Sequence, residues 1–421
     1  MIILFFGSAI LLLFLGVPMA VTLGLSSILY ILVSGTPPTI IIQTLFSGVD
    51  VSALMAIPFF ILAGDLMLTG GLAQRILDLA NAMVGKRTGG LAIVTIIGCM
   101  FFAAISGSAI ATAAALGSIM IPAMVDKGYD RDFASAVVAS ASPMGVIIPP
   151  SITFIIYGTL ANTSVSDLYI VGIPGGIIFG IALTIVAYLV SKKHGYKGSG
   201  HPFSIKEFFV SLFRAFWALG TPVILIGGVF SGIFTPTESG VVAVAYAIII
   251  GLFVYRELKF KDLWKIFFQS AKTTSSIMFI IANASLFAYI MAYEQIPQAI
   301  VSSFMSISES PIIILLMINI ILLLFGAFMD TIAVIVIVVP MFLPVITTLG
   351  IDPVLFGLIV VVNTAIGMAT PPFGATLFIS SSVGNVPFHK VAWRVLAPVG
   401  AAIIALFIIT YIPEVVMFWL K

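Results

Sequence analysis

Long apolar stretches, interrupted by short polar connectors, follow one another along this sequence. The pattern predicts the same order of elements in each half: a pair of apolar helices, an amphipathic arm, another helix, a hairpin, a broken helix and a final helix. In the first half the expected ranges are 2–15, 18–33, 36–50, 51–70, 91–125, 133–160 and 167–191. In the second half they are 215–234, 237–255, 256–272, 273–293, 311–345, 354–383 and 395–418. The pattern therefore predicts an all-α chain.

The composition assigns these helices to a membrane. Of 421 residues, 61% are hydrophobic and 8% are charged, and the mean hydropathy is +1.27. A water-soluble core cannot bury so much apolar surface, so we expect a lipid bilayer around the chain. The first apolar stretch is expected to be membrane structure and not a removable signal. Cys99 is the single cysteine, which excludes an intrachain disulfide and a cysteine-based metal site.

Two double prolines interrupt otherwise helical segments. Pro149 and Pro150 follow Gly145 within residues 142–151, and Pro371 and Pro372 occupy the same place 222 positions later. Proline lacks the N–H that a helix needs, so both segments should open at membrane depth. Two broken helices at corresponding places in two halves are typical of a transporter's binding site.

Each broken helix follows a long apolar segment with small polar residues at its centre. A single helix over 91–125 would reach ~50 Å, whereas the hydrocarbon core measures ~30 Å. A re-entrant hairpin with its tip at 106–112 fits better. The counterpart over 311–345 carries Gly326, Asp330 and Thr331 near its tip.

The basic residues predict that residues 1–214 and 215–421 are two inverted repeats. With the N-terminus outside and each hairpin returning to its starting side, seventeen of the eighteen Lys and Arg residues fall on the cytoplasmic side. They are Arg75, Lys86, Arg87, Lys127, Arg131, Lys192, Lys193, Lys197, Lys206, Arg214, Arg256, Lys259, Lys261, Lys265, Lys272, Lys390 and Arg394. Lys421 is the exception. This division requires the second half to be upside down and places both termini outside.

Backbone carbonyls released at the breaks favour Na⁺, because a hard cation prefers oxygen ligands. We expect one Na⁺ site per half, between a hairpin tip and a break. The first would use Ser106, Ser108, Thr112, Gly145 and Pro150; the second would use Gly326, Asp330, Asn363, Gly367, Thr370 and Pro372. Half-helix N-termini would attract a carboxylate substrate. Candidate substrate contacts are Thr112, Ser142, Asn363, Phe373 and Gly374.

Structural alternatives remain open for single elements. A double proline can mark a simple kink, and the carboxylate of Asp330 can be satisfied by Thr331 and backbone N–H groups. Asp65 is a second ionisable residue at membrane depth, where such residues are candidates for function. It belongs to no repeated motif, and its role is undecided.

Five motifs resemble those of one transporter family over nearly the whole chain. They lie at 57–64 (IPFFILAG), 106–112 (SGSAIAT), 145–151 (GVIIPPS), 232–238 (GIFTPTE) and 369–374 (ATPPFG). Together they resemble the large membrane subunit of a tripartite ATP-independent periplasmic (TRAP) transporter, most similar to the sialic-acid kind.

The resemblance implies an elevator-type symporter of the bacterial inner membrane, not an enzyme. It is expected to import an organic acid, such as a sialic acid or a C4-dicarboxylate, with two or more Na⁺ ions and no organic cofactor. The implied partners are a small four-helix membrane subunit and a periplasmic substrate-binding protein; no nucleic-acid partner is expected. The Na⁺ positions carried over from the family are Ser106, Ser108, Gly145, Ile148 and Pro150, then Asp330, Gly367, Thr370 and Pro372.

Two other functions are compatible with parts of this sequence. A stand-alone Na⁺/carboxylate symporter or Na⁺/H⁺ antiporter would keep the fold without the partners, with Asp330 as the titrating group. An intramembrane aspartyl protease would need Asp65 and Asp330 in one site. It is disfavoured because the two carboxylates lie at non-equivalent places in the halves.

Overall fold

The computed structural model describes residues 1–84, 88–196 and 204–420, and the described part of the chain is helical and free of strands. It contains eight helices long and apolar enough to cross a membrane, or up to ten if each of two bent pairs is one span. The all-α membrane fold is therefore confirmed. The predicted cytoplasmic positions of Lys86, Arg87 and Lys197, and the outside position of Lys421, concern residues outside the described ranges.

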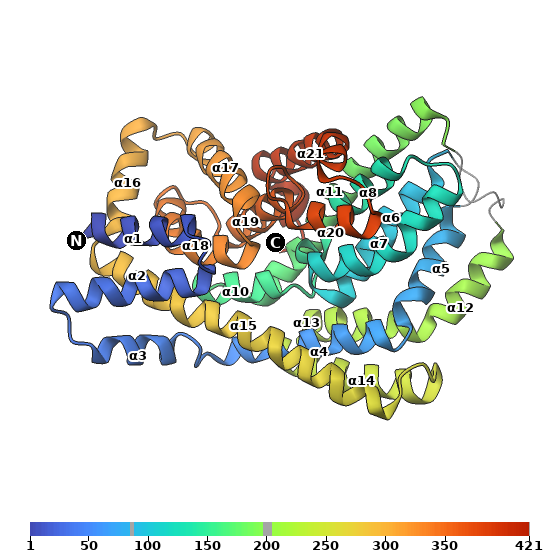
Figure 1. Cartoon of the computed structure of the whole chain (residues 1–421), viewed down its shortest axis with the longest axis horizontal. Coiled ribbons are helices and arrows are strands. Elements are labelled where there is room, and N and C mark those ends of the chain that lie inside the picture. The colour runs from blue at the N-terminus through green and yellow to red at the C-terminus, as the bar shows by residue number, and fades with distance from the viewer. Residues whose placement is uncertain (85–87, 197–203, 421) are drawn as a thin grey trace.

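The first half runs from α1 to α11 (Figure 1). Its helices are α1 Ile2–Phe14, α2 Met19–Ser34, α3 Thr39–Ser47, η1 Ser52–Met55, α4 Ala56–Thr69, α5 Leu72–Val84, α6 Gly90–Ser106, α7 Ala109–Asp126, α8 Arg131–Ala141, α9 Met144–Ile147, α10 Ile152–Leu160 and α11 Val165–His194. The expected hairpin is the α6–α7 pair, and α8, α9 and α10 form the expected broken helix.

The second half runs from α12 to α22. Its helices are α12 Ile205–Pro222, η2 Val223–Gly227, α13 Gly228–Phe230, α14 Pro236–Ile249, η3 Ile250–Val254, α15 Phe260–Tyr293, α16 Ile296–Ile307, α17 Pro311–Phe328, α18 Thr331–Thr348, α19 Pro353–Met368, α20 Ala375–Gly384, α21 Phe388–Tyr411 and α22 Glu414–Met417. The hairpin is the α17–α18 pair, and α19 and α20 form the broken helix.

The helix bounds repeat with the spacing of the double prolines. The first and last residues of α18 lie 222 positions after those of α7, and α19 begins 222 positions after α8. The division into two repeats, and the inverted orientation of the second, stay predictions. The proposed boundary after residue 214 lies inside α12, which begins at Ile205.

Two local predictions were wrong. The arm at 256–272 and the helix at 273–293 are one continuous helix, α15, of 34 residues. Neither glycine nor proline occurs between Phe260 and Tyr293, so nothing in the backbone ends the helix where the arm was expected to stop. The connector at 294–310 contains a helix, α16, with Pro297 in its first turn, a position that favours helix initiation.

The hairpins and broken helices of the two halves pack against one another. The helix α20 contacts α7 and α8, α19 contacts α17, and α21 contacts α8 and α11. The long helix α15 packs along α2, α3 and α4 and also contacts α18 of the second hairpin (Figure 1). Both hairpins thus meet a wall made by α4 and α15.

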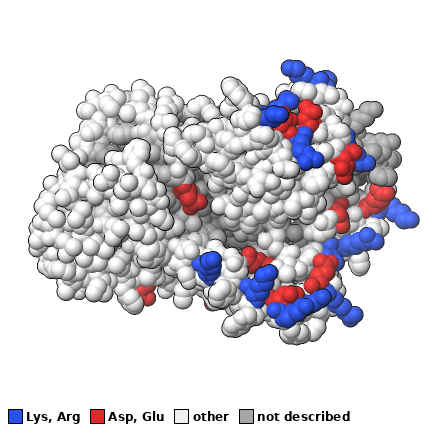
Figure 2. Space-filling view, in the orientation of Figure 1, with Lys and Arg blue, Asp and Glu red and all other residues white. Residues whose placement is uncertain are grey.

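Charged residues are distributed unevenly over the surface. On the face shown in Figure 2, Lys and Arg gather toward the end where α5 and α12 lie in Figure 1. The opposite end of this face, over α1 and α16, is free of them. The first residue of the described chain lies toward the end of this face that is free of Lys and Arg (Figure 1).

Candidate functional site

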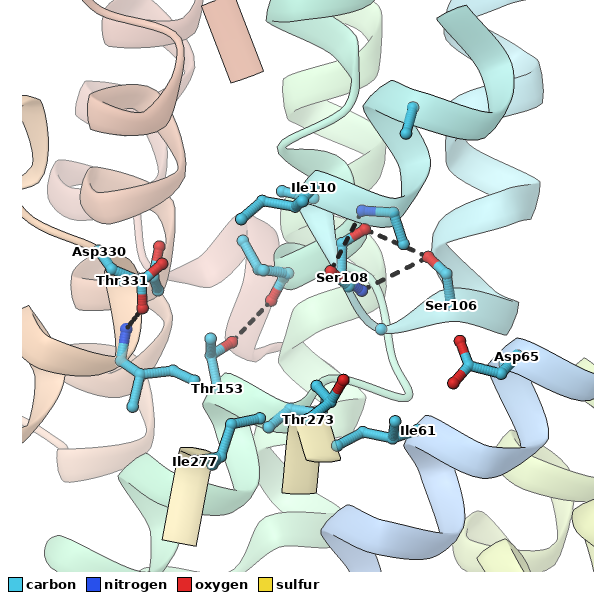
Figure 3. A pocket seen from close by; sticks show the side chains of 18 of the residues that line it. Ile61, Asp65, Ser106, Ser108, Ile110, Thr153, Thr273, Ile277, Asp330 and Thr331 are labelled. Atoms are coloured by element: carbon cyan, nitrogen blue, oxygen red, sulfur yellow. Dashed lines mark hydrogen bonds between the residues drawn. The ribbon is translucent and has the colours of Figure 1, made fainter. Parts of the chain in front are cut away.

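A cavity of about 460 Å³ lies where both hairpin tips face α4 and α15 (Figure 3). Its polar lining residues are Asp65, Ser106, Ser108, Thr153, Gln269, Thr273, Asp330 and Thr331. Val146 and Met368, from the two broken helices, also line it. Residues of both halves that lie more than 200 positions apart in the sequence therefore share one cavity.

The first hairpin tip is a two-residue turn that leaves several oxygen atoms close together. Gly107 follows the end of α6 with φ +57°, a left-handed conformation that favours glycine. The hydroxyl of Ser108 caps α7 by accepting a hydrogen bond from the Ala111 N–H at 3.3 Å. The turn leaves Ser106 and Ser108 beside the cavity.

The oxygen atoms of this tip meet the first broken helix at Gly145. The Thr112 hydroxyl donates to the Ser108 carbonyl at 2.7 Å and lies 2.9 Å from the Ser106 hydroxyl. A Cβ on Gly145 would lie 2.7 Å from the Ser108 carbonyl oxygen and 2.9 Å from the Thr112 hydroxyl. Only glycine allows this approach.

Pro150 completes the cluster at the first tip. A Cβ on Gly107 would lie 2.9 Å from the Pro150 carbonyl oxygen. The structure thus brings together the predicted residues Ser106, Ser108, Gly145 and Pro150. Ile148 ends α9 in an extended conformation, and its side chain packs on Gly176 of α11, which leaves only its backbone for an ion. A cluster of hydroxyl and carbonyl oxygens matches the preference of Na⁺.

The first break bends the helix by 45° between Arg131–Ile147 and Ile152–Leu160. The peptide bond between Pro149 and Pro150 is cis. The carbonyl of Val146, released by the break, accepts hydrogen bonds from the hydroxyls of Ser151 at 2.6 Å and Thr153 at 3.0 Å. Downstream hydroxyls thus replace the missing helix donors.

The second break repeats this arrangement with other residues. The Pro371–Pro372 bond is cis as well, and the Met368 carbonyl accepts a hydrogen bond from the Thr376 hydroxyl at 2.8 Å. Met368 lies 222 positions after Val146. Thr376 also donates toward the Ala139 carbonyl of α8 at 2.9 Å, which connects the broken helices of the two halves.

Gly367 meets the second hairpin backbone to backbone. A Cβ on Gly367 would lie 2.3 Å from the carbonyl carbon of Gly326 in α17. Thr370 is tied back to its own segment, since its hydroxyl donates to the Ile366 carbonyl at 2.7 Å. Pro372 belongs to the same turn, but neither Thr370 nor Pro372 is among the residues that line the cavity.

Asp330 faces the cavity and also caps a helix. Its Oδ2 accepts a hydrogen bond from the Ile332 N–H at 3.1 Å at the start of α18. The buried hydroxyl of its neighbour Thr331 has no hydrogen-bond partner within the described ranges. Asp330 occupies the place of Ser108, 222 positions later, and both are N-caps of the second hairpin helix.

None of the five candidate substrate residues is on the lining of the cavity. Thr112 belongs to the oxygen cluster, and the Ser142 hydroxyl donates to the Val138 carbonyl. Asn363 donates to Asn319 at 2.7 Å. Phe373 packs on Phe328 with ring centroids 5.6 Å apart, and the Gly374 N–H donates to the Thr370 carbonyl at 3.1 Å. Their roles in substrate binding stay predictions.

The wall of the cavity contains residues that the sequence did not assign. Asp65 lies across the cavity from Asp330 (Figure 3), and its Oδ2 accepts a hydrogen bond from the Ser270 hydroxyl at 2.6 Å. Gln269 and Thr273 line the same wall from α15. Asp65 had one detectable signal, an ionisable group within an apolar helix; its pairing with Ser270, 205 positions away, had none.

The oxygen ligands that line the cavity suit an alkali metal ion better than a transition metal ion. Across residues 1–84, 88–196 and 204–420, no three His, Cys, Asp or Glu side chains come together as a metal site. The hairpin tips offer hydroxyl and backbone carbonyl oxygens and the carboxylate of Asp330. The wall opposite them offers the carboxylate of Asp65. Such a set can hold a weakly bound cation that must also be released.

Apolar spans, paired hairpins and broken helices around a polar cavity define a multi-pass membrane protein of the secondary-transporter class. The family model of the tripartite ATP-independent periplasmic transporter, DctM component, matches residues 6–415. The chain belongs to this family of TRAP transporter large permeases.

Several curated relatives cover most of the chain. The isethionate TRAP transporter permease protein DctMQ of Oleidesulfovibrio alaskensis is 43% identical over 98% of this chain and 65% of its own length. A C4-dicarboxylate TRAP transporter large permease protein DctM of Pseudomonas aeruginosa is 44% identical over 77% of this chain and 76% of its own. The sialic acid TRAP transporter large permease protein SiaM of Vibrio cholerae is 38% identical over 96% and 94%. The chain thus spans about two thirds of the Oleidesulfovibrio protein.

A solved structure shares the fold. The YdaH transporter of Alcanivorax borkumensis superposes with a TM-score of 0.62, covering 89% of this chain and 87% of its own, at 13% sequence identity. At that identity the likeness concerns the fold alone.

Proposed function

We propose that this chain imports an organic acid anion together with two or more Na⁺ ions by an elevator mechanism. The proposal rests on the cavity of about 460 Å³, called the central cavity from here on, where the oxygen-rich tips of both hairpins meet both broken helices. In this mechanism the hairpins and broken helices form the moving body. The helices α4 and α15 form part of the fixed wall.

The charge of the cavity supports coupling to cations. Its lining contains Asp65 and Asp330 but no Lys, Arg or His among the described residues. An organic anion there meets like charge, so bound Na⁺ supplies the compensating positive charge. Each charge moved across the membrane is worth ~2.3 kcal/mol per 100 mV, so two Na⁺ with one monoanion are driven inward.

The proposed setting is the inner membrane of a bacterium, with both termini on the periplasmic side. The gathering of basic residues at one end supports this orientation, because cytoplasmic ends of membrane proteins are enriched in Lys and Arg. Family membership supports two partners: a small four-helix membrane subunit and a periplasmic protein that delivers the solute.

The proposed substrate is an organic acid anion, and the proposal names the chemical class and not one particular acid. Relatives are named for isethionate, C4-dicarboxylates and sialic acid. The relatives named for the first two acids show identities of 43% and 44%, and the sialic acid relative shows 38%. Sialic acid therefore stays a prediction beside the other two.

Uptake in proteoliposomes tests the proposal. The chain, its small subunit and the periplasmic protein are reconstituted, and uptake of labelled N-acetylneuraminate, succinate and isethionate is measured with a Na⁺ or a K⁺ gradient. We expect uptake of one acid that needs both the Na⁺ gradient and the binding protein. Uptake by the chain alone would contradict the tripartite arrangement, and uptake independent of Na⁺ would contradict the coupling.

A further inference from the structure

A second cavity of about 290 Å³ adjoins the central one along α4 and α15. It is lined by Asp65, Leu68, Thr69, Asp262, Lys265, Ile266 and Gln269. Asp65, Leu68 and Gln269 line both cavities. The two cavities therefore adjoin at these residues and continue toward the start of α15.

One face of α15 leads from this second cavity into the central one. Lys265, Gln269, Thr273 and Ile277 are spaced four residues apart, so they follow one another along the helix. Lys265 and Gln269 line the second cavity, and Gln269, Thr273 and Ile277 line the central one. From Lys265 to Thr273 the helix rises ~12 Å, so the face forms a polar track between the two cavities.

Lys265 is the only basic residue on either lining within the described ranges. It is exposed and forms no ion pair with a described residue. The nearby carboxylates have other donors: Asp65 accepts from the Ser270 hydroxyl, and Asp262 accepts from the Lys259 N–H at 3.2 Å. The ammonium group thus remains available to an anion.

The neighbouring Trp264 indicates the level of this opening. Its side chain is 80% exposed, and tryptophan is enriched at the boundary between lipid and water. The same end of α15 carries Lys259 and Lys261, which places it on the predicted cytoplasmic side.

We propose that Lys265 and Gln269 form an anion-binding site on the fixed wall, at the cytoplasmic mouth of the transport cavity. It receives the carboxylate or sulfonate group of the substrate after the Na⁺ sites release it. This inference rests on the proposed function, because it requires an organic anion to leave through the cavity. The ammonium of Lys265 attracts the anion and the amide of Gln269 donates a hydrogen bond.

A charged thiol reagent tests the electrostatics without knowledge of the substrate. Thr69→Cys places a reporter on the opposite wall of the second cavity, while the single native cysteine, Cys99, is buried. Inside-out vesicles containing the complete transporter are treated with 2-sulfonatoethyl methanethiosulfonate or its cationic trimethylammonioethyl analogue. The ratio of the anionic to the cationic reaction rate reports the local potential.

We expect Lys265→Gln to lower this ratio by about fivefold, as loss of one nearby charge in water predicts, and Lys265→Arg to preserve it. The matched control is Lys261→Gln, which removes the same charge one turn earlier on the same helix, outside both linings. Equal ratios in Lys265→Gln and Lys261→Gln would overturn the site. Reaction of the reporter from the periplasmic side alone would overturn its cytoplasmic position.

Exchange from inside the vesicle tests the site during transport. With N-acetylneuraminate, succinate and isethionate as probes in the reconstituted complex, Lys265→Gln should raise the half-saturating concentration on the cytoplasmic side about threefold. The Na⁺ dependence of uptake should not change. An unchanged cytoplasmic half-saturation with intact uptake would overturn the exit site alone. Loss of Na⁺-driven uptake in the wild type would overturn the proposed function, and the reagent ratio would still decide the exit site.

Discussion

Gly326 of α17 and Gly367 of α19 touch through their backbones, so that a Cβ on Gly367 would lie within 2.5 Å of three backbone atoms of Gly326. No side chain can move aside to make room. The contact fixes the second hairpin against the second broken helix. A comparable contact in the first half places Gly145 of the first broken helix beside Ser108 of the first hairpin tip.

Gly367→Ala should therefore destabilise the protein by about 3 kcal/mol, the upper range for an overpacked core, and should abolish Na⁺-driven uptake. Thermal unfolding in detergent and uptake in proteoliposomes measure the two effects. Gly400→Ala is the control, because its Cβ would meet no atom within 4 Å. Normal stability and uptake in Gly367→Ala would show that the close approach is not needed.

Asp330→Asn should raise the Na⁺ concentration that half-saturates uptake about tenfold, because it removes a charge from the cavity and leaves a side chain that can still cap α18. Asp352→Asn is a matched control: Asp352 caps α19 by accepting from the Val354 N–H at 2.7 Å and does not line the cavity. If both variants show the same Na⁺ dependence, Asp330 acts only as a cap.

Thr112→Val removes a hydroxyl from the oxygen cluster at nearly constant volume. If Thr112 belongs to the first Na⁺ site, the Na⁺ concentration that half-saturates uptake should rise about threefold to tenfold, because one oxygen ligand is lost. Thr184→Val removes a similar hydroxyl, which donates to the Gly180 carbonyl of its own helix at 2.7 Å, away from the cavity. A change in substrate affinity without a change in Na⁺ dependence would assign Thr112 to the substrate instead.

Thr376 connects two broken helices by donating toward the carbonyls of Ala139 and Met368. Thr376→Val should cost about 2 kcal/mol, since it leaves buried carbonyls without their donor. Thr347→Val is the control, because the exposed Thr347 also donates toward two carbonyls, those of Leu343 and Pro344, where water can replace it. Equal thermal stability of the two variants would mean that the bridge contributes nothing.

The breaks and tips could be predicted because proline and glycine act on their own backbone. Pro149 and Pro150 cannot continue a helix wherever the rest of the chain lies, and the polar residues at 106–108 end α6 at the residue expected for a tip. Positions fixed by such local effects were located within a few residues.

Contacts between distant segments could not be predicted in this way. No periodicity in α4 indicates that Asp65 meets Ser270, or that α15 supplies Gln269 and Thr273 to the cavity. The continuity of α15 was missed for the opposite reason. The change from an amphipathic to an apolar pattern near residue 272 suggested that one helix ends there and another begins. The backbone continues as one helix because no glycine or proline interrupts residues 260–293.

The inverted orientation of the two halves gives the last prediction. The helix α5 precedes the first hairpin and α16 precedes the second, and Asp78 and Ser302 are exposed residues at similar places on them. If the second half is upside down, the two positions lie on opposite faces of the membrane. Asp78→Cys should react with a membrane-impermeant maleimide only from the cytoplasmic side, and Ser302→Cys only from the periplasmic side. Because the native Cys99 is buried, the unmodified chain serves as the blank. Labelling of both positions from one side would refute the inverted repeat.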